Sequence, residues 1–218
     1  KIVILATLAL ATLCLILTFS RGAWVGLALS ILVFATLKEP RLFILLFIGI
    51  LVVPMFLPPV IIDRIASIGS LEDSSNAFRI SIWIASIRMI KDYWLTGLGL
   101  GLSAFSRVYR DYMLAGTPAV HSHNLYLQIG LEMGVAGIIA IIWMVSRGLS
   151  LAITGLKKIP WSFLQAGIIS ALVGHLLHGL FDYVWYSPKI VMTFWLLFGI
   201  MSAMSSTEVV KNEQESMK

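Results

Sequence analysis

Two histidines and an asparagine, His121, His123 and Asn124, stand in the segment HSHNLYLQ directly before an apolar stretch. The chain has only four histidines, so this is a local concentration of titratable side chains. At neutral pH an imidazole can accept a proton from a hydroxyl group, and a neighbouring asparagine can orient it or bind a substrate. The same segment can instead begin a helix, with Ser122 or Asn124 as the N-cap. The residues alone favour neither interpretation over the other.

The spacing of the two histidines argues against a shared metal ion. Side chains two positions apart point in opposed directions on an extended segment, and about 200° apart on a helix. No cysteine or carboxylate follows His121 and His123 at ligand spacing. The single Cys14 lies in an apolar run, so the sequence predicts no disulfide and no redox site. We therefore expect no metal site.

An arginine in apolar surroundings is a second candidate. The segment from Asp73 to Asn76 offers several N-cap residues, and it predicts a helix over residues 77–93. Arg79 falls on the apolar face of this helix, where an unpaired guanidinium is costly. It needs a carboxylate or an anionic ligand, unless it extends to water. Arg88 lies on the polar face of the same helix.

Further ionisable residues lie within or beside apolar segments. Glu132 is one or two turns into an apolar helix and is expected to pair with an arginine. His175, His178 and Asp182 share a helical face by their i, i+3, i+7 spacing. Polar contacts between helices are the favoured interpretation for these three, ahead of a proton relay and then a metal site.

Two other segments are given structural interpretations. GLGLG at residues 97–101 follows no predicted strand, so it indicates a flexible turn and not a phosphate-binding loop. Arg107 and Arg110 lie among aromatic residues in FSRVYRDY. A solvated helical face is preferred there to a surface that stacks sugars.

Composition places the chain in a membrane. Of its 218 residues, 59% are hydrophobic and 12% charged, and the mean hydropathy is +0.93. Lysine and arginine are scattered singly in spite of a net charge of +5, which excludes nucleic-acid binding. We therefore predict an all-α, polytopic membrane protein with short soluble sections.

About six transmembrane helices are predicted. Residues 2–37 are too long for one span, so a break is expected near Ser20-Arg21-Gly22. The remaining spans are expected at residues 42–62, 129–145, 161–180 and 190–204. The chain then divides into three spans (1–62), an extracytoplasmic loop with an amphipathic helix (63–128), three further spans (129–204) and a loose polar cytoplasmic tail (205–218).

The distribution of basic residues predicts the orientation. With Lys1 inside, the cytoplasmic segments contain Lys38, Arg41, Arg147, Lys157, Lys158, Lys211 and Lys218. Arg21, the long loop 63–128 and the short loop 181–189 then share the extracytoplasmic face. A site on that face works without cytoplasmic ATP or nucleotide sugars.

Four sequence stretches resemble one family when taken together. They are TFSRGAWVGL, FRISIWIASIRMIKDYWLTGLGLG, HSHNLYLQIGLEMGVAG and HGLFDY. From about Thr18 to Ile200, the chain resembles the O-antigen ligase and O-antigen polymerase superfamily. The ordered series of an SRG arginine, R-x3-W, G-x-G and H-x-H-N is the specific part. Members are GT-C-type glycosyltransferases with about twice as many spans. Since the chain also begins with Lys1 within an apolar segment, we expect it to be a C-terminal half.

The resemblance implies an activity and a set of site residues. Members transfer a glycan from a polyprenyl diphosphate carrier, such as undecaprenyl diphosphate, to an acceptor hydroxyl outside the bacterial cytoplasmic membrane. They invert the anomeric centre and use neither metal nor cofactor. The implied general base is His123, with His121 as the substitute. The implied substrate-binding residues are Arg21 and Arg79, which would hold the diphosphate. Asn124, Arg88 and Asp182 are further candidates for binding substrate.

The resemblance leaves the acceptor open. Glycan, lipid and protein acceptors all occur among enzymes with these motifs, including enzymes that build lipopolysaccharide and other cell-envelope polysaccharides. Some relatives have been regarded as inorganic-carbon transporters, so a membrane solute transporter is the alternative function. A transporter does not need a base beside two arginines, and these relatives often lack the histidine pair.

Overall fold

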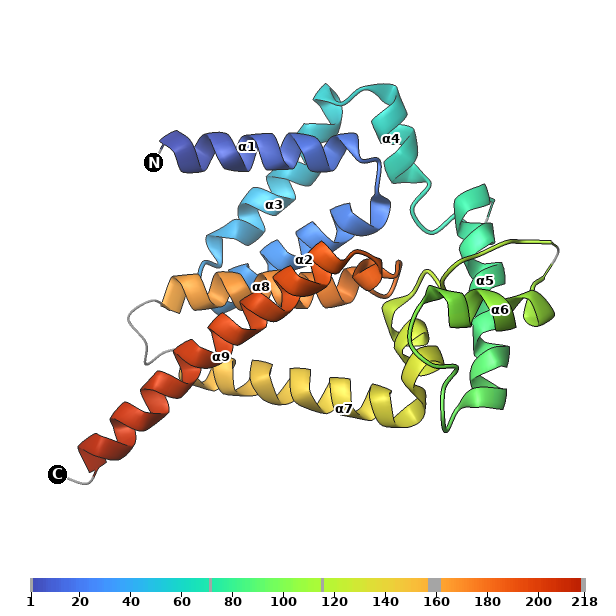
Figure 1. Cartoon of the computed structure of the whole chain (residues 1–218). Helices are drawn as coiled ribbons and strands as arrows, with labels where there is room; N and C mark the ends of the chain where they lie inside the picture. The colour runs from blue at the N-terminus through green and yellow to red at the C-terminus, as the bar shows by residue number, and fades with distance from the viewer. Residues whose placement is uncertain (1, 71, 115, 157–161, 217–218) are drawn as a thin grey trace.

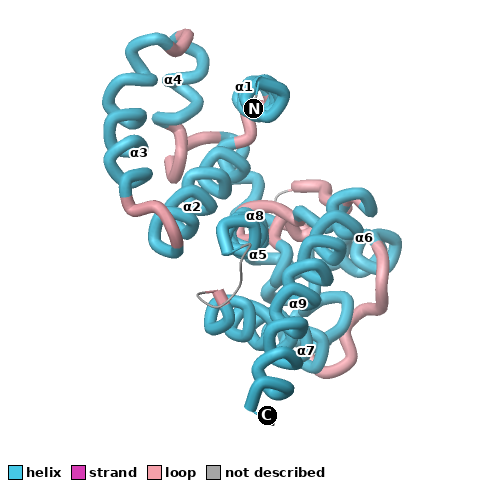
Figure 2. The backbone as a smooth tube through the Cα atoms, turned by 90° about the vertical axis from the view of Figure 1, so that its left-hand side faces the viewer, coloured by secondary structure: helices cyan, strands magenta, loops and turns pink. Residues whose placement is uncertain are grey.

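The computed structural model describes residues 2–70, 72–114, 116–156 and 162–216, and the regular elements of these segments are all helical (Figures 1 and 2). The α-helices are α1 (Ile2–Leu17), α2 (Arg21–Leu37), α3 (Arg41–Val52), α4 (Pro59–Ala66), α5 (Ser74–Tyr93), α6 (Leu102–Tyr112), α7 (Leu125–Gly155), α8 (Ser162–His178) and α9 (Pro188–Ser216). Two 3-10 helices, η1 (Val53–Phe56) and η2 (Val184–Tyr186), join them. The all-α prediction is confirmed.

Two of the described helices are long and apolar enough to cross a membrane, namely α7 and the part of α9 that ends at Ser205. The other apolar helices are shorter, with bounds Ile2–Leu17, Arg21–Leu37, Arg41–Phe56 and Ser162–His178. A helix of 17 residues, such as α2 or α8, measures about 26 Å against a hydrocarbon core of roughly 30 Å. Six spans were predicted, but only two of the described helices are long enough to cross a membrane.

The helix boundaries follow local chemistry. The break near Ser20 is confirmed, and the Ser20 hydroxyl accepts a hydrogen bond from the N–H of Ala23 at 3.4 Å. Asp73 caps α5 by accepting from the N–H of Asn76 at 3.1 Å, which also agrees with the sequence. The continuous span predicted over residues 42–62 is wrong. Prolines lack the N–H that a helix requires, and Pro54, Pro58 and Pro59 divide this segment into α3, η1 and α4.

Two apolar helices extend beyond their predicted bounds. α7 begins and ends outside the span expected at residues 129–145, and α9 continues past Met204 to Ser216, where a loose tail was expected. Trp161, the expected start of the fifth span, lies outside the described residues, as do Lys157 and Lys158.

A seam of small residues joins α2 to α8, the helix pair with the most extensive contact in the described chain. The α2 residues Gly22, Gly26 and Ser30 recur every four positions and therefore share one face. A Cβ built on Gly26 would lie 3.1 Å from the Cβ of His178, and one on Gly174 would lie 2.6 Å from the carbonyl oxygen of Gly26. The backbones thus touch directly, as small residues permit between apolar helices. The seam brings the start of α2 beside the end of α8, since a Cβ on Gly22 would lie 2.9 Å from Cδ2 of His178.

Replacing Gly174 with alanine is expected to destabilise the protein, because the added methyl group meets backbone that cannot rotate away. Overpacking of this kind costs about 2 kcal/mol, or roughly 5 °C in Tm for a chain of this size. The matched control is Gly167→Ala in the same helix, where a Cβ meets nothing within 4 Å. The Tm of each variant is measured in detergent by heating the protein and following its aggregation by size-exclusion chromatography. Equal Tm values for the two variants would contradict the seam.

The long loop forms a small helical unit at one end of the bundle, where α5 runs across the direction of α7 and α8 (Figure 1). Its core contains Ile82, Ala85, Met89, Phe105, Tyr109 and Leu131. Arg107 and Arg110 are exposed on α6, as the solvated-face interpretation predicts.

The GLGLG turn packs against a kink in α7. The Leu98 N–H donates to the Leu131 carbonyl at 2.6 Å, and the Val135 N–H donates to the Trp94 carbonyl at 2.7 Å. Gly97 and Gly134 both have positive φ, and a Cβ on Gly97 would lie 2.6 Å from the carbonyl oxygen of Glu132. The glycines permit this close approach. The motif is a turn, as predicted, and it supports the first turns of α7.

Candidate active site

Asn124 begins α7 as its N-cap. Its side-chain oxygen accepts hydrogen bonds from the N–H groups of Tyr126 at 2.9 Å and Leu127 at 3.0 Å. Its side-chain nitrogen donates to the carbonyl of Leu180 at 2.8 Å. The cap interpretation of the HSHN segment is therefore confirmed, and the same residue joins this segment to the turn after α8.

The two histidines face one another. His123 has a φ of 49°, in the left-handed region that non-glycine residues rarely adopt. As a result, the ring centroids of His121 and His123 lie only 4.1 Å apart. The prediction that the rings point in opposed directions is wrong, because the segment is neither extended nor helical at His123. Strained backbone of this kind is found at functional sites when its surroundings fix it.

Asp182 joins a histidine to an arginine. One carboxylate oxygen lies 3.0 Å from Nδ1 of His123, and the other lies 3.3 Å from Nη2 of Arg79. The carboxylate is thus the anionic partner that the apolar position of Arg79 requires. The seam between α2 and α8 and the Asn124–Leu180 hydrogen bond hold this turn in place.

The negative charge of Asp182 determines which ring nitrogen of His123 carries a hydrogen. Burial alone would raise the pKa of Asp182, but the His123 hydrogen bond, the positive charge of Arg79 and the Tyr183 N–H together lower it to about 2. An ionised carboxylate only accepts hydrogen bonds, so Nδ1 of His123 carries the hydrogen between them. In a neutral imidazole, Nε2 is then the free acceptor.

His121 has the opposite arrangement. Its Nδ1 accepts the N–H of His123 at 3.2 Å, so Nε2 carries the hydrogen of the neutral ring. Burial, followed by the charge of His123, lowers the pKa of His121 to about 4, which leaves this ring neutral at physiological pH. Of the two rings, His123 is therefore the one with a ring nitrogen, Nε2, that has no hydrogen-bond partner among the described residues.

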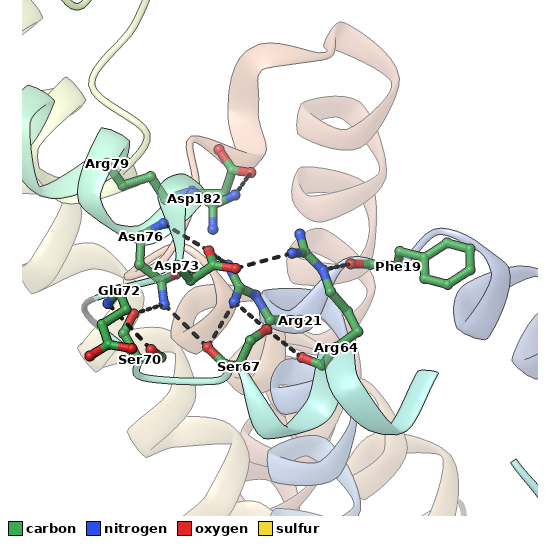
Figure 3. A network of polar contacts seen from close by, with 10 residues as sticks. All are labelled: Phe19, Arg21, Arg64, Ser67, Ser70, Glu72, Asp73, Asn76, Arg79 and Asp182. Atoms are coloured by element: carbon green, nitrogen blue, oxygen red, sulfur yellow. Dashed lines mark hydrogen bonds and ion pairs between the residues drawn. The ribbon is translucent and has the colours of Figure 1, made fainter. Parts of the chain in front are cut away.

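Arg21 lies in a dense polar network (Figure 3). It is only 6% exposed, and its terminal nitrogens donate to the carbonyl and the hydroxyl of Ser67, to Asp73 at 2.7 Å and to Asn76 at 2.8 Å. The hydrogen bond from Arg21 lowers the pKa of Asp73, which Arg64 also approaches at 3.5 Å. Arg21 thus anchors the first turn of α5, and Arg79 lies farther along the same helix. The sequence singled out Asp73 and Asn76 as caps and missed them as partners of Arg21.

Asp182 lines one of two pockets and contacts Arg79, which lines the other. The first has a volume of about 260 Å³ and contains both arginines, with lining residues Arg21, Gly22, Val25, Ile68, Gly69, Asn76, Arg79, Ile80, Trp83 and Phe181. The second has a volume of about 300 Å³ and contains the histidines, with lining residues Ser20, His121, His123, His178, Asp182, Tyr183, Val184, Tyr186, Ser187 and Ile190. One site therefore has an arginine side and a histidine side.

Other sequence candidates lie outside this arrangement. Arg88 is exposed and forms no hydrogen bond or ion pair within the described chain; it is nine positions after Arg79, on the opposite face of α5. Glu132 accepts a hydrogen bond from Gln128 at 2.9 Å in place of the expected arginine. His175 packs against Phe194 at the α8–α9 contact. Its buried Nε2 has no hydrogen-bond partner among the described residues, so the expected polar contact between helices is not formed by this ring.

Two residues that the sequence did not reveal support the strained backbone. Gln128 is fully buried, and its side-chain oxygen accepts the N–H of Ser122 at 2.8 Å. Nε1 of Trp83 donates to the carbonyl of His123 at 3.1 Å. Trp83 is the tryptophan of the R-x3-W motif, and this spacing was the only sequence signal for it. Together they fix the backbone on both sides of His123.

Replacing Gln128 with leucine is expected to slow the reaction of this site about tenfold, because a buried N–H loses its acceptor and the imidazole loses its fixed position. The matched control is Gln165→Leu, which removes a fully buried glutamine that donates to Ser205 between α8 and α9. Both variants are expected to lose stability, but only Gln128→Leu should lower kcat. A comparison of kcat and Tm for the two proteins measures this. Similar kcat values would exclude a positioning role.

The same geometry removes the spacing argument against a metal ion. His121, His123 and Asp182 each present a ligand atom, and these atoms all lie within 4.8 Å of one another. The expectation of no shared metal site, as far as it rested on that spacing, is therefore wrong.

Comparison with known proteins identifies the family. A family model described as O-antigen ligase matches residues 6–142, which include Arg21, Arg79 and the HSHN segment but not Asp182. No curated protein and no solved structure matches the chain. Because the match covers more than half of the chain, and the structure is all-helical as the motifs imply, the protein belongs to the membrane-associated O-antigen ligase family.

Proposed function

We propose that the protein transfers a glycan from a polyprenyl diphosphate carrier to an acceptor hydroxyl, with inversion and without a metal ion. The proposal depends on one observation above all: Asp182 contacts His123 with one oxygen and Arg79 with the other. A general base and a cation suited to a leaving diphosphate are thereby held next to each other.

The arginine pocket suits an amphiphilic diphosphate. Arg79 is 24% exposed there, so its guanidinium can leave Asp182 and form charge-assisted hydrogen bonds with phosphate oxygens. Apolar residues such as Val25, Ile80 and Phe181 line the same pocket and are compatible with the first units of a prenyl chain. Arg21 borders the pocket while it anchors α5, so it contributes positive charge from a fixed position.

The reaction needs no further reagent. The acceptor oxygen attacks the anomeric carbon and forms the new glycosidic bond, while its proton moves to Nε2 of His123. The bond between the anomeric carbon and the diphosphate oxygen breaks, and its electron pair leaves with the diphosphate. Fixed arginine charges stabilise the developing negative charge, and Asp182 stabilises the imidazolium that forms.

The hydrogen-bond pattern supports His123 as the base and His121 as a neighbour that orients it. Nδ1 of His121 is occupied by a backbone N–H, whereas Nε2 of His123 is free to accept. Asn124 acts through its cap and its hydrogen bond to Leu180. Asp182, first expected to bind substrate, is assigned a positioning role, and Arg88 is assigned none.

We place the site at the outer face of a bacterial cytoplasmic membrane that the protein crosses several times. The distribution of lysine and arginine supports this orientation. The apolar helices α1, α2 and α8 approach the length of a span, and α7 and α9 reach it. The loop carrying α5 and α6 then covers the outer ends of these helices.

A reconstituted transfer assay tests the proposal. Proteoliposomes containing the full protein receive undecaprenyl diphosphate-linked glycan from the outside, with and without EDTA, and the release of undecaprenyl diphosphate is measured. Release at the same rate in EDTA is expected. Loss of release in EDTA would overturn metal independence. Intact donor together with uptake of bicarbonate would favour the transporter alternative.

A further inference from the structure

His178 lies at the site but takes no part in the steps proposed so far. It is the last residue of α8, and its side chain lines the histidine pocket together with His121, His123 and Asp182. The ring is partly buried, and neither of its nitrogens has a hydrogen-bond partner among the described residues. His178 therefore presents an unpaired polar ring to the space in which a substrate would bind.

The seam between α2 and α8 fixes the position of this ring. A Cβ on Gly26 would lie 3.1 Å from the Cβ of His178, and a Cβ on Gly22 would lie 3.1 Å from its Nε2. Because both neighbours are glycines, the imidazole rests directly on the backbone of α2. A hydrogen bond from a ring held in this way loses little side-chain entropy.

His178 lies at the boundary between the two pockets. Gly22, which Nε2 of His178 approaches, lines the arginine pocket, whereas His178 itself lines the histidine pocket. The charges of Asp182 and Arg79 both act on the ring. A group bound between the arginines and the histidine pair would therefore pass beside His178.

Inversion places the transferred sugar at this boundary. In a direct displacement, the anomeric carbon lies between the attacking oxygen and the leaving oxygen. The leaving diphosphate is assigned to the arginine pocket, and the proton of the attacking hydroxyl is assigned to Nε2 of His123. The sugar that is attached to the diphosphate then lies beside His178.

An imidazole suits the polar edge of such a sugar. It offers an N–H donor in both of its protonation states, and the oxygen of a hydroxyl or acetamido group can accept from it. The substituent at C2 is next to the anomeric carbon. Positive charge develops on the sugar ring as the diphosphate leaves, and hydrogen bonds to the substituent at C2 strengthen in such transition states. A hydrogen bond of this kind raises kcat, since it is stronger in the transition state than in the bound donor.

We infer that His178 donates a hydrogen bond to the substituent at C2 of the donor sugar that is attached to the diphosphate. This inference rests on the proposed function. It names the donor class as one whose first sugar carries a hydroxyl or acetamido group at C2.

Donors with and without this substituent test the inference. Full protein in proteoliposomes receives undecaprenyl diphosphate-linked disaccharides whose first sugar is glucose or 2-deoxyglucose, and the release of undecaprenyl diphosphate is measured. With the glucose donor, His178→Leu is expected to lower kcat about thirtyfold. With the 2-deoxyglucose donor, the same variant should stay within about twofold of the wild type. His178→Gln retains an N–H donor and should lose only about threefold with the glucose donor.

The control is His175→Leu, the same substitution one turn earlier in α8. Nε2 of His175 is buried and His175 lines neither of the two pockets, so kcat should stay within about twofold of the wild type with both donors. Comparing each variant with the wild type on the same donor removes the difference in intrinsic reactivity between the two sugars.

Two results would overturn the role of His178. One is an equal loss with both donors in His178→Leu, which would assign the ring to the packing of the seam. The other is an unchanged kcat with the glucose donor in the same variant. A wild-type protein that releases undecaprenyl diphosphate from neither donor would instead overturn the proposed function.

Discussion

Glycan transfer by His123→Ala is expected to fall about a thousandfold, because the attacking hydroxyl loses the group that accepts its proton. Removal of a general base costs roughly 10² to 10⁴ in rate. The loss should appear in kcat, with little change in KM for the donor, since His123 lies outside the arginine pocket. Steady-state release of undecaprenyl diphosphate from labelled donor measures both parameters.

Backbone strain must be separated from chemistry in this experiment. His123 has a positive φ, which alanine tolerates poorly and asparagine tolerates well. His123→Asn should therefore fold as the wild type does and still lose the activity. His121→Ala removes the hydrogen bond to the His123 N–H and the ring that packs beside His123, and it is expected to lose about tenfold in rate. If His121→Ala were the more severe variant, the two histidines would exchange their assigned roles.

Arg79→Lys is expected to reduce kcat/KM about a hundredfold although the charge is retained. Lysine cannot present the planar pair of N–H donors that fits phosphate oxygens. Loss of one fixed donor to a developing oxyanion typically costs 10² to 10³. The measurement is donor turnover in proteoliposomes containing equal amounts of protein.

Arg88→Lys is the matched control for this substitution. It changes the same side chain in the same helix, but at an exposed position without an ion pair in the described structure. Its activity should stay within about twofold of wild type. If both variants are tolerated equally, Arg79 does not hold the diphosphate. If both fail equally, the effect belongs to α5 as a whole and not to the donor pocket.

Local chemistry made much of this fold predictable from the sequence. The cap at Asp73, the break at Ser20 and the start of α7 at Asn124 depend on neighbouring residues, and all three agree with the structure. The need of Arg79 for an anion was also visible, because it follows from one helical face. The three prolines between residues 54 and 59 are also a local signal for a helix break. The span over residues 42–62 was nevertheless predicted, because the residues around these prolines are apolar.

The remaining features depend on contacts between distant segments. Asp182 meets Arg79 across 103 positions and His123 across 59, and no spacing rule specifies such pairs. The facing rings of His121 and His123 require a left-handed backbone that Gln128 and Trp83 support from other turns. The candidate residues could therefore be predicted from the sequence, but the contacts between them could not.

The direct contact of α2 with α8 makes the geometry of the site independent of what surrounds the outer helices. Apolar side chains of α1 and α3 are exposed, whereas the separation of α2 and α8 is set by backbone against backbone. The distance from Arg21 to the turn at Asp182 follows from that separation. We expect catalytic geometry to be insensitive to lipid composition and to drift of the lipid-facing sequence. The same outer surface can then vary among related proteins while the geometry of the site stays constant.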